Sequence, residues 1–443
     1  INLYLAQTLR QATKEVIKNV EVSQNLDLRN FIVVPDRFSL QAEKLLFQEL
    51  GISSTFNIDV ISISKLASLV LKLSGNQFKT QSNLEGMLLV YKILIEHQAE
   101  FESLKDANLS IDLAKEIFLT ISQLKSCEIS ADKFLKSANE LANQKLIDIA
   151  KIYSFYECSE REKIDAADLI TLFAQQIEES ELIKNSNFYF AEFDSFTSQA
   201  RTIIQLLVKC SRSVSIATCS TTGENEYIYE QDVLQKVAQI CENLKIKPNI
   251  IICEKNQNEF QKHIADNLFA FKQTLKNIPY GAAILNNSNI TSEIEQIANI
   301  IKFEILQNGY NFSDFNIFVP SLQSYQKQIS EIFSSEDIAC YIDATKTLLD
   351  LAPIKFILKV FDFLKDENIL NFLALVSDNF SQINKEEVEL LNKNIFEKGF
   401  KVNDALNLEI NNIGIFNKKI KKIKEQYEKI KVFSEFIELL VEI

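Results

Sequence analysis

Glycine, proline, histidine and tryptophan are all scarce in this chain of 443 residues. It holds 8 Gly, 5 Pro, 2 His and no Trp. So few turn-forming residues argue against an all-β protein that reverses direction every ten residues or so. The two histidines, His97 and His263, leave little for imidazole catalysis. No apolar run approaches the roughly 18 residues that a membrane-spanning helix needs, so we expect no membrane partner.

The seven cysteines and the charge balance narrow the class further. The cysteines are odd in number and widely spaced, and no two form a C-x-x-C pair, which leaves zinc-ribbon or iron–sulfur ligation unsupported. We interpret them as reduced cysteines of a cytoplasmic protein. Forty-seven basic against sixty acidic side chains give a net charge of −13. Because a bulk attraction for nucleic acid is missing, DNA binding would require a local basic path or a partner's field.

Short apolar segments alternate with helical ones near the start of the chain. Strands are predicted at 2–6, 30–35 and 58–63, and helices at 9–20, 40–50 and 65–73. Strand signals return at 187–191, 213–218 and 249–253, with helices at 198–209 and 227–244 between them. Such alternation is typical of a parallel sheet covered on both faces. We therefore predict a first α/β domain made of residues 1–74 and 180–280.

Between these two regions the pattern is purely helical. Apolar residues recur at helical spacing in five segments, which are 84–98, 111–126, 131–139, 141–157 and 167–178. Residues 75–179 are therefore expected to form a helical domain inserted between the third and fourth strands of one sheet.

A second α/β domain is predicted to begin near residue 281. Strands are expected at 282–286, 314–319 and 339–342, and helices at 292–307 and 321–333. After Pro353 the pattern is helical again. We interpret 281–365 as the start of this domain and 366–443 as a helical insertion within it. The apolar residues 435–443 carry no stop signal, so we expect the chain to be part of something longer.

Several stretches then resemble one protein family in a consistent order. They are 34–44 (VPDRFSLQAEK), 60–67 (VISISKLA), 145–153 (KLIDIAKIY), 164–170 (IDAADLI), 193–199 (FDSFTSQ), 314–319 (DFNIFV) and 341–343 (YID). Together they resemble AddB and RexB, the B subunits of the bacterial AddAB/RexAB helicase–nuclease. The resemblance implies an α/β fold with two RecA-like parallel-sheet domains of superfamily 1 helicase type, each with a helical insertion.

The phosphate cradle of an ATP-driven helicase is degenerate in this sequence. A P-loop needs glycines for close backbone approach, a lysine on the phosphates and a Ser or Thr on magnesium. On that pattern the glycines fall on Ala6 and Gln11, the lysine falls on Ala12, and only Thr13 matches. No G-K-S or G-K-T occurs anywhere in the chain. We therefore expect no nucleotide binding.

Two further positions agree with this loss. The Walker B acid falls on Ala191, at the end of a predicted strand. Glu192 stands beside it, but a side chain one residue along a strand points to the other face. Pro320 stands where the family pattern offers an arginine that senses the γ-phosphate. RexB-type subunits share the missing P-loop, so the departure fits the resemblance.

The resemblance implies a function in DNA double-strand-break end processing and recombinational repair. The chain would be the non-motor, helicase-like part of an exonuclease subunit, paired in a heterodimer with an AddA/RexA-type motor-nuclease on single- and double-stranded DNA. It would hold or scan the single strand for the Chi recombination signal. The DNA-contact candidates are Arg37, Ser62 and Lys65, in loops after early strands. No catalytic residue, cofactor or metal is expected here, because the iron–sulfur cluster and divalent metal belong to a C-terminal nuclease domain outside this chain.

Structural explanations stand beside several of these functional ones. Asp165 and Asp168 fit the N-cap and N3 acid of a helix, and Ser62 and Ser64 fit solvated positions on an alternating strand. The alternative function is an ATP-independent α/β scaffold or adaptor without nucleic-acid binding, which the acidic net charge favours. An enzyme with an unrecognised site is disfavoured because no convergent His, Cys or carboxylate set is evident.

Overall fold

The chain forms two compact units, Ile1–Gly281 and Ala282–Ile443. The computed structural model describes residues 1–6, 8–21, 28–75, 78–107, 109–159, 163–219, 231–253, 260, 263, 283–344, 348–399, 401–409 and 411–430. The apolar residues 435–443 and the first residues of the helix expected at 227–244 lie outside this set. Among the helices of these residues, none combines the length and the apolar character that crossing a bilayer requires.

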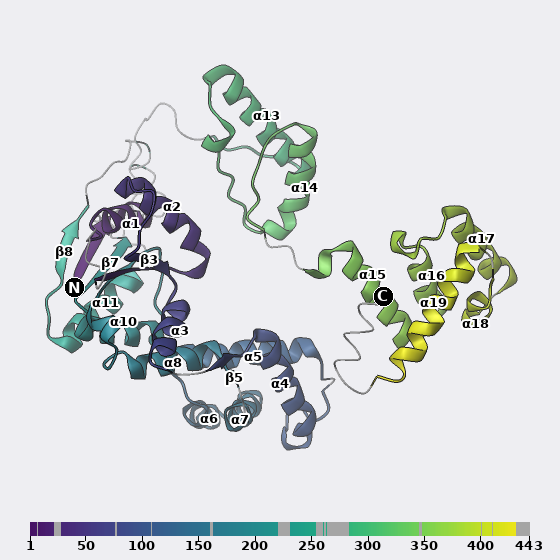
Figure 1. Ribbon diagram of the computed structural model, residues 1–443, viewed down its shortest axis with the longest axis horizontal. Helices are drawn as coiled ribbons and strands as arrows, with labels where there is room; N and C mark the ends of the chain where they lie inside the picture. The colour runs from purple at the N-terminus through teal and green to yellow at the C-terminus, as the bar shows by residue number, and fades with distance from the viewer. Residues whose placement is uncertain are drawn as a thin grey trace. The chain divides into compact units, whose positions relative to one another are not determined.

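A six-stranded sheet, parallel throughout, lies at the centre of the first unit (Figure 1). Its strands are β1 (Asn2–Ala6), β2 (Arg29–Val33), β3 (Ile58–Ile61), β6 (Ser186–Phe190), β7 (Ser213–Cys219) and β8 (Asn249–Ile252). They lie in the order β3-β2-β6-β7-β1-β8. Pairing of Val33 with both Ile61 and Phe190 brings the carboxyl ends of β3, β2 and β6 to one edge. The six strands predicted for this domain are confirmed, with small shifts at their ends.

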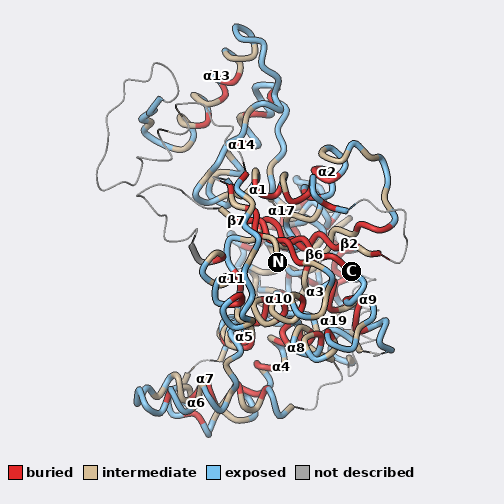
Figure 2. Tube along the Cα trace, turned by 90° about the vertical axis from the view of Figure 1, so that its left-hand side faces the viewer, coloured by how far each residue is buried: buried red, intermediate tan, exposed pale blue. Residues whose placement is uncertain are grey.

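Helices cover both faces of this sheet, as expected for a buried parallel sheet. One face carries α1 (Leu9–Lys18) and α2 (Ser39–Leu50). The other carries α3 (Ile63–Leu73), α8 (Ala166–Gln176), α10 (Ser198–Cys210) and α11 (Gln231–Leu244). A short helix, α9 (Glu181–Lys184), precedes β6. The central strands β2, β6 and β7 are therefore buried along most of their length (Figure 2), whereas the edge strand β8 is largely exposed.

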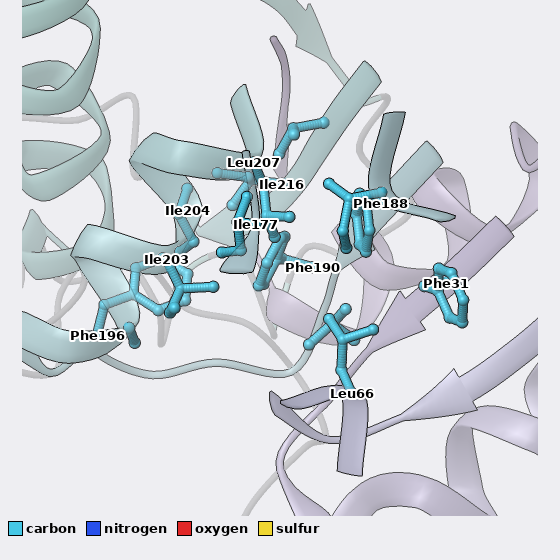
Figure 3. Close-up of a cluster of buried hydrophobic side chains, with 14 of the residues drawn as sticks. Phe31, Leu66, Ile177, Phe188, Phe190, Phe196, Ile203, Ile204, Leu207 and Ile216 are labelled. Carbon is cyan, nitrogen blue, oxygen red and sulfur yellow. The ribbon is translucent and has the colours of Figure 1, made fainter. Parts of the chain in front are cut away.

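Side chains alternate between two cores along each strand. Phe31 and Val33 pack towards α3 and α10, whereas Ile32 and Val34 pack towards α1 and α2. Figure 3 shows Phe188 and Phe190 of β6 in the first of these cores, with Ile203, Ile204 and Leu207 of α10. Because both faces are apolar, the strands read as nearly continuous apolar runs in the sequence, which is why they could be predicted.

Four helices between β3 and β6 form a block with a core of its own. They are α4 (Asn83–Glu96), α5 (Ile111–Ser126), α6 (Ala131–Glu140) and α7 (Gln144–Cys158). β3 and β6 belong to the same sheet, so the block is inserted as the sequence predicted. A short parallel pair, β4 (Lys79–Thr80) with β5 (Lys163–Ile164), joins its two ends, where only helical spacing was expected. α8, inside the predicted range 75–179, contributes Leu169 and Phe173 to the core of the sheet. The boundaries at 75 and 179 stay predictions.

The secondary structure of the described residues in the second unit is all helical. α13 (Ile290–Asn308) and α14 (Leu322–Ser335) pack together through Ile294, Ala298, Ile301, Ile329 and Phe333. A separate core joins α15 (Ala352–Lys365), α16 (Ile369–Val376), α17 (Lys385–Lys398), α18 (Val402–Leu406) and α19 (Asn411–Tyr427). The helices expected at 292–307 and 321–333 are therefore present.

The strands expected in the second unit are not formed by its described residues. The segments 283–286, 315–319 and 339–342 have no strand pairing, and residue 282 lies outside the described set. Parallel strands need paired neighbours and cover on both faces. Here Phe315 and Val319 pack on α13 and α14, but Phe318 stays 94% exposed and Tyr341 87% exposed. The prediction of strands here, and with it that of a second parallel sheet, is not confirmed by the described residues.

Candidate nucleic-acid interface

The loops after β1, β2, β3 and β6 meet at the carboxyl edge of the sheet. Ligands of open parallel sheets bind at this edge, because strand ends and helix N-termini converge there. Arg37 lies in the short helix η1 (Asp36–Phe38) that follows β2. Ser62 and Lys65 lie where β3 passes into α3. Since β2 and β3 are neighbours in the sheet, the structure brings the three predicted contact residues to one place.

Three ion pairs connect these loops across the edge. Each joins a cation to a carboxylate on the loop of a neighbouring element: Lys65 Nζ–Asp36 Oδ1 at 3.6 Å, Arg37 Nη2–Asp194 Oδ2 at 3.2 Å and Arg10 Nη1–Glu192 Oε1 at 3.6 Å. We call these six residues the edge belt. It runs from α3 through the loops after β2 and β6 to α1, and its formal charges sum to zero.

Two of the three pairs in the edge belt, Arg37–Asp194 and Lys65–Asp36, are open to solvent. The side chains of Arg37 and Asp194 are 69% and 74% exposed, and those of Lys65 and Asp36 are both 63% exposed. Exposed ion pairs of this kind contribute little to folding stability, because water screens them and long side chains lose freedom on pairing. Arg37 also makes a cation–π contact, because its guanidinium lies 4.8 Å from the centre of the Phe38 ring.

Ser62 has a different role from the two cations. It is only 3% exposed, and its hydroxyl accepts from Lys65 N as the N-cap of α3. Its Oγ also lies 3.0 Å from Oγ of Ser64. Because this hydroxyl is buried and engaged as a helix cap, it cannot contact a DNA strand in this conformation. Ser62 therefore fixes the first turn of α3, which carries the exposed Lys65, and the interpretation of Ser62 as a solvated strand residue is wrong.

The degenerate phosphate cradle lies at the start of α1. Thr8 is the N-cap of this helix, and its hydroxyl accepts from Gln11 N at 3.3 Å. That N–H is among the free donors with which a helix N-terminus binds phosphate, and here it is occupied. Ala12 and Thr13 are fully buried against the sheet, and Thr13 Oγ1 has no hydrogen bond within the described residues. The start of α1 therefore has neither the lysine nor the second glycine of a P-loop.

Glu192 lies on the side of the sheet opposite to the one expected. β6 ends at Phe190, and Glu192 has a φ of 61°, so the alternation of the strand does not extend to it. Its carboxylate faces Arg10 on α1, and Ala191 packs in the core beneath the same helix. A left-handed conformation costs a non-glycine residue about 1–3 kcal/mol. The expectation that Glu192 points away from the α1 face was therefore wrong.

A buried lysine joins the helical block to the sheet. Lys125 Nζ of α5 lies 2.7 Å from Glu157, 2.7 Å from Asp165 and 2.8 Å from Asp168. Burial alone would lower the pKa of Lys125, but hydrogen bonds to the three carboxylates outweigh burial and raise the pKa above its usual value. Asp165 also caps α8 by accepting from Ala167 N and Asp168 N. The structural explanation of Asp165 and Asp168 is therefore confirmed.

Asp36 and Asp194 were not predicted as site residues, and Glu192 was considered only as a neighbour of the Walker B position. Asp36, Glu192 and Asp194 all follow predicted strands closely, and acids at the ends of neighbouring parallel strands converge. That signal was available. The network around Lys125 had no comparable signal, because its partners Asp165 and Asp168 are 40 and 43 positions away in the chain.

Comparison with known proteins finds a family and several relatives that this chain is similar to. The family model described as "ADDB, N-terminal" matches residues 10–275, which is more than half of the 443-residue chain. The chain is also similar to proteins named as the B subunit of an ATP-dependent helicase/deoxyribonuclease. It is 26% identical over 404 residues to that of Clostridium acetobutylicum, which covers 86% of this chain and 35% of the relative.

Two other relatives of the same name give similar values. The protein of Clostridium botulinum (strain Hall) is 26% identical over 409 residues, covering 87% of this chain and 35% of the relative. That of Thermoanaerobacter sp. (strain X514) is 24% identical over 395 residues, covering 84% and 34%. This chain therefore spans only 34–35% of the length of these relatives. Since the family match covers the whole helical block and most of the sheet, the chain belongs to the AddB N-terminal family.

Proposed function

We propose that this chain is the non-motor, helicase-like part of a helicase–nuclease B subunit that acts in DNA double-strand-break end processing and recombinational repair. Its contribution is to hold single-stranded DNA at the carboxyl edge of the sheet and to scan it for the Chi signal. The observation that carries the proposal is the placement of Arg37 and Lys65. Two exposed cations from separate sequence motifs lie together where related folds bind their ligands.

The chemistry of this edge suits a sugar–phosphate backbone. Arg37 presents a planar guanidinium that can bond two phosphate oxygens at once, and Lys65 supplies a compact charge. Lys65 also sits in the first turn of α3, where the helix dipole favours anions. Contacts of this kind position a strand without reading its sequence. Scanning requires base contacts in addition, which would come from stacking on aromatic side chains.

The charge of the chain argues for a partner. A net charge of −13 slows encounter with DNA, and the edge belt itself is neutral. We propose an AddA/RexA-type motor-nuclease as the second subunit, whose basic surface would complete the DNA channel. ATP hydrolysis would belong to that subunit, because Ala12 stands where a P-loop has its lysine. A divalent metal and an iron–sulfur cluster are proposed only for a nuclease domain outside this chain.

A scaffold without nucleic-acid binding is the second candidate. The observation that favours it is the excess of acidic side chains, sixty against forty-seven basic ones. This alternative predicts that the edge belt is an ordinary solvated surface, so changes in it would leave DNA binding unaffected. The two proposals therefore differ in what substitution of Arg37 and Lys65 does.

Fluorescence anisotropy with a labelled oligothymidylate tests the proposal. The chain with Arg37→Ala and Lys65→Ala should bind more weakly than wild type. In a plot of log K against log salt concentration, the slope for this variant should also be less steep. The difference should be about 0.7 for each phosphate of the single strand that the variant no longer neutralises. The matched control is Lys14→Ala with Lys18→Ala, which removes the same charge from cations that pair with Glu49 and are not members of the edge belt.

The outcomes separate the candidates. Weaker binding in the first variant and not in the control supports the proposal. Equal binding by wild type and both variants would remove the assignment of Arg37 and Lys65. If no protein binds the oligonucleotide even with the motor subunit present, the scaffold replaces our proposal.

A further inference from the structure

The exposed cations of the edge belt each have a carboxylate in the place that a phosphate would take. Arg37 donates to Asp194 at 3.2 Å, and Lys65 lies 3.6 Å from Asp36. A carboxylate offers oxygens to a guanidinium in the same planar, charge-assisted way as a phosphate does. A strand that binds at this edge therefore competes with an internal anion for each of these cations.

The carboxylates of Asp36 and Asp194 make few other contacts that would stabilise the fold. Within the described residues, the Asp194 side chain has Arg37 as its hydrogen-bond partner, and the Asp36 side chain has its ion pair with Lys65. Neither carboxylate caps a helix in this part of the chain. Both are at least 63% exposed, so no burial holds them in place. Lys125 is the contrast, because its side chain is 6% exposed and three carboxylates fix it.

We propose that two carboxylates act as phosphate mimics: Asp36 occupies Lys65, and Asp194 occupies Arg37. They thereby limit the affinity of this edge for single-stranded DNA. This inference rests on the proposed function. Binding is then an exchange of anions. Each phosphate that takes a cation releases a carboxylate to water, and the freed carboxylate repels the neighbouring phosphates. The strand is held weakly at any one register, which suits a surface past which DNA must move.

If the anions exchange in this way, neutralising Asp36 or Asp194 should tighten DNA binding more than neutralising an acidic residue elsewhere on the surface. Removing one mimic frees its cation without changing the shape of the loop. Asp194→Asn and Asp36→Asn should each tighten binding of a labelled oligothymidylate by about two- to five-fold, the range that corresponds to loss of one exposed ion pair. The double variant should exceed either single one, because the two pairs lie on different cations.

The control must add the same charge elsewhere on the unit. Glu181→Gln serves, because Glu181 is 77% exposed and pairs with Lys184 in α9, which precedes β6 and so lies at the amino edge of the sheet. Anisotropy titrations on the full chain should show tighter binding for the two aspartate variants and unchanged binding for Glu181→Gln. Equal tightening in all three would reduce the effect to net charge and overturn the inference.

The proposed function and this inference can fail separately. If Arg37→Ala with Lys65→Ala weakens binding but neither aspartate variant tightens it, the edge binds DNA and the mimics do not regulate it. If Asp194→Asn tightens binding in a chain that also carries Arg37→Ala, Asp194 acts on something other than Arg37, and the inference fails again. If no variant binds the oligonucleotide even with the motor subunit present, both proposals fall together.

Discussion

Arg37 Nη2 donates to Asp194 Oδ2 across 3.2 Å, although the two residues are 157 positions apart in the chain. The whole helical block, α4 to α7, lies between them in sequence. The contact exists because β2 and β6 are hydrogen-bonded neighbours, so their carboxyl-end loops meet. The insertion of the block therefore leaves the pairing of β2 with β6, and with it this edge of the sheet, intact.

The edge belt should matter for binding and not for stability. Arg37→Ala is expected to change the free energy of unfolding by no more than about 0.5 kcal/mol, because both side chains of its ion pair are largely exposed. Urea unfolding followed by circular dichroism checks this. A loss of several kcal/mol would mean that Arg37 holds the fold together, and its effect on DNA would then need another explanation.

Lys125 should behave in the opposite way. Lys125→Met leaves Glu157, Asp165 and Asp168 facing one another without their cation, and we expect a loss of about 3 kcal/mol in the free energy of unfolding. This is the lower end of the range for buried pairs, because Glu157 and Asp168 are partly exposed.

A second variant at this site removes two of the carboxylates together with the lysine. Lys125→Met combined with Asp165→Asn and Asp168→Asn should recover part of the loss, since asparagine still caps α8. No recovery in urea unfolding would show that the packing of the lysine stem, and not its charge, holds the helical block to the sheet.

Acid should destabilise the helical block through Asp148 and Asp165. Burial tends to raise the pKa of Asp148, but hydrogen bonds from Ser103 and Glu102 outweigh it and lower the pKa below its usual value. Burial opposes ionisation of Asp165 as well, and the hydrogen bond from Lys125 outweighs it and lowers the pKa of Asp165. A carboxyl with a lowered folded pKa contributes stability above its unfolded pKa, about 4, and loses it as pH falls through the folded pKa.

Urea unfolding at pH 7, 5 and 3 measures this effect. Wild type should be about equally stable at pH 7 and 5 and clearly less stable at pH 3. Asp148→Asn should be less stable at pH 7 and should lose less on acidification. An equal loss in both proteins would show that Asp148 does not contribute to the acid sensitivity.

Close packing of α4 on α5 depends on a glycine. A Cβ at Gly86 would overlap the ring of Phe118, so Gly86→Ala should lower the free energy of unfolding by about 1–3 kcal/mol despite the better helix propensity of alanine. Gly86→Ala combined with Phe118→Leu should recover part of the loss by making room. If Gly86→Ala alone is neutral, the two helices can shift apart freely.

How far the sequence predicted this structure depended on the range of the interactions. Ile32 and Phe31 lie in a strand whose two faces are both apolar, so a local pattern sufficed. The turn at Glu192 was missed because a positive φ has no signal in a glutamate. Phe318 lies in a segment with strand composition, but a strand also needs partners, and composition does not show them.

For the candidate site, too, the sequence predicted some features and not others. The loop positions of Arg37 and Lys65 followed from predicted strands and from the family resemblance. Their pairing with Asp194 and Asp36 followed only from the order of the strands, which sequence alternation does not determine. Conversely, the capping role of Ser62 is a local effect, and the residues after a strand often take it.

The chain should bind no ATP. The N–H of Gln11 is occupied by the hydroxyl of Thr8, Ala12 replaces the phosphate-binding lysine, and Ala191 replaces the Walker B acid. Equilibrium titration with a fluorescent ATP analogue and magnesium should show no saturable binding up to millimolar nucleotide. Thr13→Ala is the matched control, because Thr13 is the P-loop residue that remains. Saturable binding in the micromolar range that Thr13→Ala abolishes would contradict us, and would mean that the buried hydroxyl of Thr13 still serves a nucleotide site.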